Sequence, residues 1–119
     1  MKEEKSLDNK VLDHLDNIGA WGIKYWAGAK FTKKGIPDIL ACIYGIFYGI
    51  EDKSSGGRPT MLQLKNLEWI REAGGYGILL YPNDFENFVK FVEDPHEMFN
   101  WYMSNIELQN KWKEKLEKI

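Results

Sequence analysis

The chain is poor in cysteine, lacks a long apolar run and has no excess of charge of one sign. Its one cysteine, Cys42, excludes a disulfide scaffold and indicates a reducing compartment, so we expect a cytoplasmic protein with Cys42 in its core. No apolar run approaches the roughly 18 residues of a membrane span, and the N-terminal residues form no apolar signal-peptide segment. The formal net charge of −2 gives no overall signal for nucleic acid, although a local basic patch is compatible with it.

What is present suits one globular domain. Hydrophobic residues make up 44% and charged residues 29% of the 119 residues, as in ordinary domains with a single modest core. Apolar residues at helical spacing predict a helix over about residues 3–18, with Gly19 as its C-terminal cap. Apolar segments rich in β-branched and aromatic residues predict four strands: 21–26, 37–43, 46–53 and 76–81.

Capping patterns place further helices between and after these strands. Thr60 followed by Gln63 resembles a capping box and opens a helix that ends near Ala73. Asn83 with Glu86 predicts another helix beyond the last strand. The order helix, three strands, helix, strand, helix predicts a mixed α/β domain, in which the last strand joins the sheet after a helical crossover.

The segment over residues 94–119 differs from the rest, and we interpret it as a C-terminal helical extension of a domain over residues 1–93. Asp94 as a cap and Pro95 in the first turn predict a new helix. Its apolar stripe contains Phe99, Tyr102, Met103 and Ile106. Three interpretations stay open: a helix packed on its own domain, an arm that docks on a second subunit, and a site for another protein.

The two middle strands form a predicted hairpin whose geometry brings charges together. With Tyr44 and Gly45 as a two-residue turn, Asp38 lies directly opposite Glu51. Side chains opposed in this way have Cβ atoms about 4.5–5.5 Å apart, so two carboxylates repel unless a cation lies between them or one is protonated. Lys53, two residues beyond Glu51, points to the same face of the strand.

Two interpretations fit this triad. In the first, the carboxylates hold a divalent ion such as Mg²⁺, and the lysine orients an attacking water or stabilises negative charge in a phosphoryl-transfer transition state. In the second, Lys53 forms a cross-strand salt bridge with Asp38 or Glu51 at the edge of the sheet. Spacing alone does not decide between them, because Glu-x-Lys is a common triplet.

The sequence also resembles a known family. "GIPDIL" and "GIEDK", with Pro37-Asp38 followed by Glu51-x-Lys53, resemble the signature of PD-(D/E)xK nucleases, and more narrowly the VRR-NUC family in its small stand-alone phage and bacterial form. A first helix with an early Glu, a Gly-rich loop, "PTMLQ" and "AGGYG" match in the same order, over about residues 4 to 92. The resemblance implies a restriction-endonuclease-like αβββαβ core, and the cytoplasm of a bacterium or of a phage-infected host.

The resemblance assigns roles within the triad. It implies that Asp38 and Glu51 bind Mg²⁺ or Mn²⁺, with the backbone carbonyl of Asp52 as a further ligand, and that Lys53 is the catalytic lysine. The side chain of Asp52 points to the opposite face of the strand, and its role stays open.

Two helix residues match the family as well. Gln63 corresponds to a glutamine that reaches toward the site, although the same residue completes the predicted capping box. Glu4 corresponds to the acid of the first helix and continues the buried stripe, where an unpaired acid is costly. A shift of one residue would give this role to Glu3, and a solvated N-terminal acid is the alternative.

Basic side chains in the loops before and after the triad are candidate DNA phosphate contacts: Lys30, Lys33, Lys34 and Arg58. Solvated charged loops are the equally weighted alternative. Of the tryptophans, Trp21, Trp26 and Trp69 fall in or beside regular elements and are predicted to lie in the core.

The leading prediction is a metal-dependent endodeoxyribonuclease. The resemblance implies a branched DNA substrate, such as a Holliday junction, and a homodimer that cuts two strands, because a subunit of this size has room for one active site. The alternatives are a monomeric nicking or flap nuclease, and a non-catalytic DNA-binding or assembly module that keeps the fold with a salt-bridged triad.

Overall fold

The apolar spacing at the start of the chain produces helix α1 (Lys2–Asn17) of the computed structural model, which describes residues 2–26 and 33–118. Leu7, Val11 and Leu15 are buried along one side of this helix. Gly19 follows with a φ of +74°, a conformation that glycine adopts without strain. The predicted first helix and its glycine cap are therefore confirmed.

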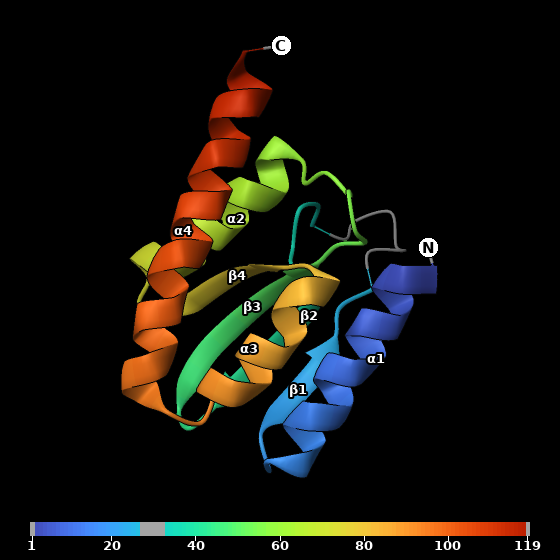
Figure 1. Ribbon diagram of the computed structural model, residues 1–119, viewed down its shortest axis with the longest axis vertical. Coiled ribbons are helices and arrows are strands. Elements are labelled where there is room, and N and C mark those ends of the chain that lie inside the picture. Colours follow the sequence, from blue (N-terminus) through green and yellow to red (C-terminus); the bar gives the residue numbers. More distant parts are fainter. Residues whose placement is uncertain (1, 27–32, 119) are drawn as a thin grey trace.

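Four strands form one mixed sheet in the order β1-β2-β3-β4 (Figure 1). The first three, β1 (Trp21–Lys24), β2 (Ile39–Ile43) and β3 (Ile46–Asp52), are antiparallel neighbours. β4 (Tyr76–Leu80) lies parallel to β3 after a crossover through α2 (Met61–Glu72), as the order of elements predicts.

The β2–β3 hairpin has the predicted turn and register. Tyr44 and Gly45 both have positive φ, +50° and +81°, which matches the turn to the right-handed twist of the strands. Ile43 lies opposite Ile46, and the same register continues along the ladder to the start of β2. This pairing is what directs Asp38 toward the end of β3.

The helix after β4 begins later than its sequence predicts. Asn83 belongs to a short 3₁₀ turn, η1 (Pro82–Asp84), and the carboxylate of Asp84 accepts the main-chain N–H of Tyr81 at 3.2 Å. Helix α3 (Phe85–Phe91) starts after this turn. The predicted cap at Asn83 is wrong, because the residue before α3 is Asp84, whose carboxylate is bonded to Tyr81 and makes no capping bond to the helix.

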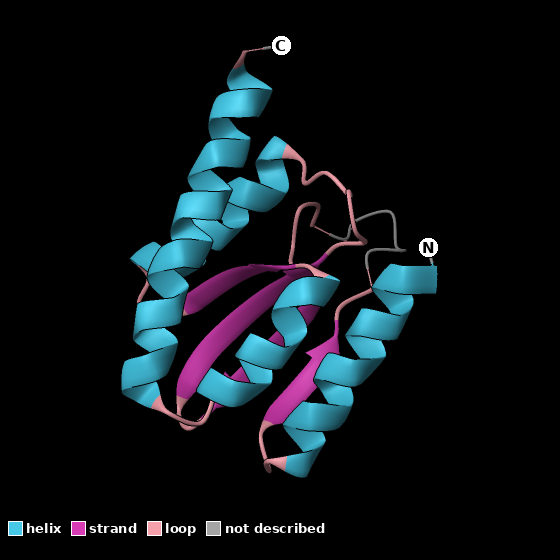
Figure 2. Ribbon diagram, viewed as in Figure 1, coloured by secondary structure: helices cyan, strands magenta, loops and turns pink. Residues whose placement is uncertain are grey.

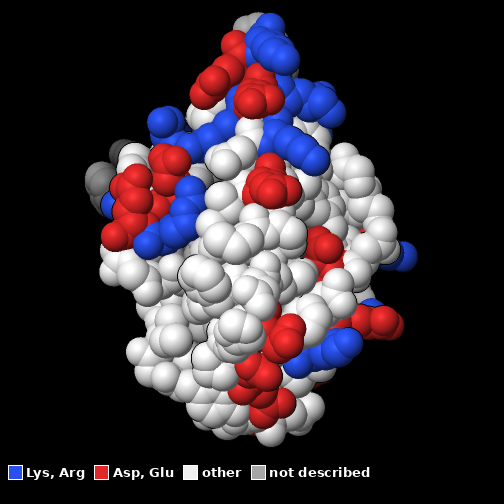
Figure 3. Space-filling model, turned by 60° about the vertical axis from the view of Figure 1, so that its left-hand side comes forward, with Lys and Arg blue, Asp and Glu red and all other residues white. Residues whose placement is uncertain are grey.

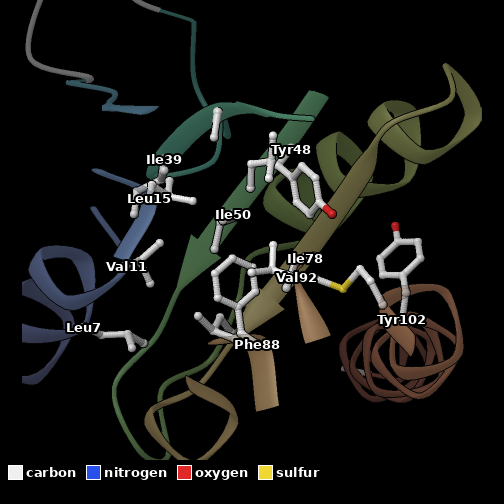
Figure 4. Close-up of a cluster of buried hydrophobic side chains, with 14 residues drawn as sticks. Leu7, Val11, Leu15, Ile39, Tyr48, Ile50, Ile78, Phe88, Val92 and Tyr102 are labelled. Atoms are coloured by element: carbon white, nitrogen blue, oxygen red, sulfur yellow. The ribbon is translucent and has the colours of Figure 1, made fainter. Parts of the chain in front are cut away.

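Helices cover both faces of the sheet (Figures 1 and 2). α1 and α3 lie on one face, and α2 lies on the other, mainly over β3 and β4. The larger core lies under α1 and α3, where Val11, Ile50 and Phe88 point toward one another (Figure 4). A smaller core under α2 joins Leu64 and Leu67 to Leu79.

Helix α4 (Pro95–Glu117) runs along β4, the strand at one edge of the sheet. It begins as predicted, because the carboxylate of Asp94 accepts two N–H groups of the first turn. Met98 and Tyr102 add to the larger core, and apolar residues from the second half of the helix pack on the smaller core.

Polar side chains of α4 bind the open edge of β4. The amide of Asn105 accepts the N–H of Leu79 at 3.0 Å and donates to its C=O at 2.8 Å, as a neighbouring strand would. The hydroxyl of Tyr102 bonds both main-chain groups of Gly77, and Gln109 donates to the same carbonyl at 2.8 Å. α4 thereby satisfies backbone groups that an uncovered edge leaves unpaired.

Four side chains predicted to lie in the core are exposed. The exposed fractions are 58% for Trp21, 75% for Trp26 and 48% for Trp69, and Cys42 is exposed as well. Trp21 and Cys42 are partners across β1 and β2, on the face that α2 covers over the other two strands. For Trp21 and Cys42 the core prediction is wrong because α2 does not reach far enough across the sheet. Trp69 is exposed on α2 itself, and Trp26 lies beyond the end of β1, at a cavity bordered by α1.

The α/β fold class is confirmed: an N-terminal helix, a four-stranded mixed sheet with helices on both faces, and a long C-terminal helix. The radius of gyration, 13.6 Å, is that of a single compact domain of this length. Across the described ranges, no helix has both the length and the apolarity needed to cross a membrane.

Candidate active site

Asp38 is held at the open end of the hairpin from two sides. The main-chain N–H of Asp52 donates to Asp38 Oδ2 at 2.9 Å. The N–H of Tyr25 donates to the main-chain carbonyl of Asp38 at 2.8 Å, which extends the pairing of β1 with β2 by one residue. These bonds direct the Asp38 carboxylate toward Glu51, as the predicted register requires.

Glu51 and Lys53 complete the group of charges predicted from the hairpin. Lys53 Nζ lies 3.4 Å from Glu51 Oε2, and the two residues are 9% and 2% exposed. Burial, followed by the negative charge of Asp38, raises the pKa of Glu51 to about 9. Burial likewise raises the pKa of Asp38. The ion pair with one lysine therefore does not compensate for the proximity of the two carboxylates.

Asp52, whose role the sequence left open, is fully buried on the opposite face of β3. Its carboxylate lies beside Asp8 of α1, which forms an ion pair with Lys24 of β1. Burial first, and then the interaction with Asp8, raises the pKa of Asp52 well above its usual range. Sequence reasoning missed Asp8, although its spacing of three and seven residues from Val11 and Leu15 places it in the buried stripe of the helix.

The charges at this end of the sheet do not balance. Four buried or half-buried carboxylates stand against two ammonium groups: Asp8, Asp38, Glu51 and Asp52, with Lys24 and Lys53. Within the described residues, Glu51 Oε1 and both carboxylate oxygens of Asp52 are buried without a hydrogen-bond donor. A divalent cation, or two protons, would neutralise the excess.

The donor set suits an ion that keeps part of its water shell. In the described part of the chain, no three Asp, Glu, His or Cys side chains are grouped closely enough to hold a metal by themselves. Asp38 and Glu51 supply two carboxylates, and Mg²⁺ commonly takes one or two of these and fills its remaining positions with water or other oxygens. The uncompensated Glu51 Oε1 fits such an ion.

The two acids of the first helix have different surroundings. Glu4 is half-buried and lines a cavity of about 380 Å³ together with Asp8 and Asp38. The carboxylate of Glu3 instead accepts hydrogen bonds from the N–H and the hydroxyl of Ser55, in the glycine-containing loop that follows Lys53. Glu4 thus shares a cavity with one member of the triad, Asp38, and Glu3 anchors α1 to the adjacent loop.

Gln63 forms the capping box that its sequence spacing predicts. Its side-chain oxygen accepts the N–H of Thr60 at 2.9 Å, and the Thr60 hydroxyl accepts the N–H of Gln63 at 3.1 Å. This structural role accounts for the residue without a contact to the triad.

The candidate phosphate contacts are spread around the site. Arg58 is exposed, and its guanidinium lies 5.6 Å from the ring centre of Trp112 in α4. Lys34 is exposed, and Lys33 lines a hollow beside Trp69 on the α2 side of the sheet. Lys30 lies outside the described residues.

Comparison of the sequence with models of known protein families and with curated proteins found no match. The residues and their geometry therefore carry the functional proposal, together with the resemblance of the motifs.

Proposed function

We propose that the protein is a metal-dependent endodeoxyribonuclease that hydrolyses phosphodiester bonds. The observation that carries this proposal is the buried, charge-unbalanced group of Asp38, Glu51 and Lys53 at the open end of one hairpin. A fold stabilised by an ordinary salt bridge gains nothing from a second carboxylate that faces the first. A site for a divalent cation and a phosphate requires such a carboxylate.

Different residues of the chain would have different roles in the reaction. Asp38 and Glu51 would hold the ion, with the main-chain carbonyl of Asp52 beside them, and the Asp52 N–H keeps Asp38 in place. The ion, Mg²⁺ or Mn²⁺, supplies Lewis-acid stabilisation of the charge that develops on the phosphoryl oxygens. Lys53, nearly buried and 3.4 Å from Glu51, contributes a fixed positive charge to the transferring phosphate. Glu4 borders a cavity that Asp38 also lines and would accept a proton from water there.

For the substrate we propose branched DNA, cut by a homodimer. This part rests on the resemblance of the motifs and on the limit of one such site per chain. A surface on α4 supports the second subunit: Figure 3 shows a broad area without charged side chains on this side of the molecule. Exposed Phe99 and Met103 border an apolar hollow there, which Ile46 and Tyr76 also line.

Cleavage and metal binding are the tests of the proposal. Linear duplex, flap and four-way-junction DNAs should be incubated with the protein and Mg²⁺, Mn²⁺ or EDTA, and Mn²⁺ binding should be measured by calorimetry. We expect cutting with either metal, fastest on the branched DNAs, and none with EDTA. DNA binding without Mn²⁺ binding or cleavage would instead identify a non-catalytic DNA-binding module, and a nuclease that stays monomeric would identify a nicking or flap enzyme.

A further inference from the structure

Trp26 is the most exposed of the large hydrophobic side chains that the structure describes, at 75%. It directly follows Tyr25, whose N–H is bonded to the main chain of Asp38, so its backbone position is fixed relative to the proposed metal ligand. Folding gives such a side chain little reason to be tryptophan, since little of its apolar surface is removed from water.

The surroundings of Trp26 differ from those of an apolar contact surface. The ammonium group of Lys24 lies 5.0 Å from the centre of the Trp26 ring and is itself held by the carboxylate of Asp8. Trp26 lines the same cavity as Asp38, which Lys2 and Lys5 border together with Glu4 and Asp8. An aromatic ring beside lysines, next to carboxylates that a bound metal ion would neutralise, suits a ligand that combines a flat ring with negative charge. A protein partner would be expected on an apolar area such as the one around Phe99.

We infer that Trp26 is a stacking platform for an unpaired nucleobase next to the phosphate that is cut. The inference rests on the proposed function and deepens it by naming the structural element of the substrate that is recognised. In a continuous duplex each base is covered by its neighbours on both faces, so one exposed ring on the protein can stack only on a base that an interruption of the helix exposes. Gaps, flaps and junction centres offer such bases, and stacking works with any of the four.

The inference is tested by comparing Trp26, two residues beyond β1, with Trp21 at the start of that strand. Trp26→Ala removes the platform, Trp26→Phe keeps a smaller one, and Trp21→Ala is the matched control. Trp21 is 58% exposed and lies at the other end of β1, beside Gly19 and Tyr44. All variants are made in the full chain and in a Lys53→Ala background, so that affinity can be measured with Mn²⁺ present and without cutting.

The probes are a continuous duplex and the same duplex with a single-nucleotide gap opposite one 2-aminopurine, whose fluorescence falls when it stacks. We expect Trp26→Ala to lose about 5- to 150-fold in affinity for the gapped DNA, the range that corresponds to removing one base-stacking aromatic. Affinity for the continuous duplex should stay within twofold, and the fluorescence quenching should disappear. Trp26→Phe should retain most of both signals, and Trp21→Ala should match its parent.

Equal losses on the gapped and continuous DNAs, or unchanged quenching in Trp26→Ala, would overturn the inference. A change in oligomeric state without a change in DNA binding would assign Trp26 to a protein contact and would also overturn it. If the parent binds and cuts DNA but Trp26→Ala behaves like it, only this inference fails. If the parent neither binds nor cuts any of these DNAs, the proposed function fails as well. Circular dichroism and melting temperature confirm that each variant is folded before it is scored.

Discussion

The main-chain N–H of Asp52 donates a 2.9 Å hydrogen bond to the side chain of Asp38. One residue of β3 therefore fixes the carboxylate that precedes β2, and the bond needs an oxygen acceptor but no negative charge. Asparagine in place of Asp38 can keep this bond while it removes a charge that repels Glu51.

We expect Asp38→Asn to abolish cleavage and to weaken Mn²⁺ binding, while the metal-free protein stays as stable as the parent or becomes slightly more stable. Lys53→Ala should also abolish cleavage but should leave Mn²⁺ binding largely intact, because a cation is not a ligand. Both variants should still bind DNA. Melting temperature, Mn²⁺ calorimetry and junction cleavage, measured on the parent and both variants, check these outcomes. Cleavage by Asp38→Asn at the rate of the parent would show that the hairpin is not the active site.

The pH dependence of stability should reveal the excess of carboxylates. The pKa of Glu51 is raised to about 9, and those of Asp38 and Asp52 are raised as well, so between about pH 5 and 9 the folded state binds more protons than the unfolded state. Stability therefore falls as pH rises through this window. In EDTA the melting temperature should decrease from pH 5 to 9, with a flatter profile for Glu51→Gln, and saturating Mn²⁺ should restore stability at high pH. A melting temperature that rises across this range would contradict the prediction.

The basic side chains around the site should contribute affinity without sequence preference. Replacing Lys33, Lys34 and Arg58 together by alanine should weaken binding to all DNA sequences alike. It should also reduce the slope of log affinity against log salt, by about 0.9 for each phosphate contact that is lost in a duplex. Lys90→Ala, on the exposed side of α3, is the control. An unchanged slope in the triple variant would assign these side chains to ordinary solvated loops.

The dimer should depend on the exposed part of α4. Phe99 and Met103 are 53% and 40% exposed, whereas Tyr102 of the same predicted stripe is buried in the domain. We expect light scattering at tens of micromolar to give a dimer for the full chain and a monomer for the double variant Phe99→Ser, Met103→Ser. Phe47→Ser, at a residue 44% exposed on β3, serves as the control. A monomeric parent would contradict the prediction.

The polar contacts of α4 with β4 should contribute more to the free energy of unfolding than polar groups on the surface do. Asn105→Ala leaves the buried N–H and C=O of Leu79 without partners, which should cost about 2–4 kcal/mol of unfolding free energy. Asn110→Ala, at an exposed position five residues further along the same helix, should change it by less than about 0.5 kcal/mol. Urea unfolding of the three proteins measures the difference, and equal stabilities would show that water replaces the Asn105 amide.

The hairpin was predictable from sequence because its determinants are local. A two-residue turn at Tyr44 and Gly45 fixes which residues face each other, so the approach of Asp38 to Glu51 follows from spacing. The order of the elements followed from apolar periodicity and caps in the same way.

The surroundings of several side chains could not be predicted from sequence, because they depend on which helices and strands meet in three dimensions. The Asp52 side chain meets a second carboxylate because α1 places Asp8 against the end of β3, a contact between residues far apart in the chain. Trp21 and Trp26 belong to a segment, residues 21–26, whose composition is that of a core strand. Whether they are buried depends on how far the helices reach over β1. Asn105 and Gln109 look like solvent-facing residues, although their helical phase with Met98 and Tyr102 was a usable signal.

The cover that α4 provides for β4 has a consequence for the order in which the protein matures. During synthesis the strands leave the ribosome before Tyr102, Asn105 and Gln109, so a nascent chain passes through a stage in which the apolar segment Tyr76–Leu80 has an unprotected edge. In this interval the segment can pair with a strand of another nascent chain. A chaperone that binds the segment at this stage would prevent such pairing. A stop codon or a protease cut within α4 would make this vulnerable stage permanent, so such products are expected in inclusion bodies rather than as smaller active domains.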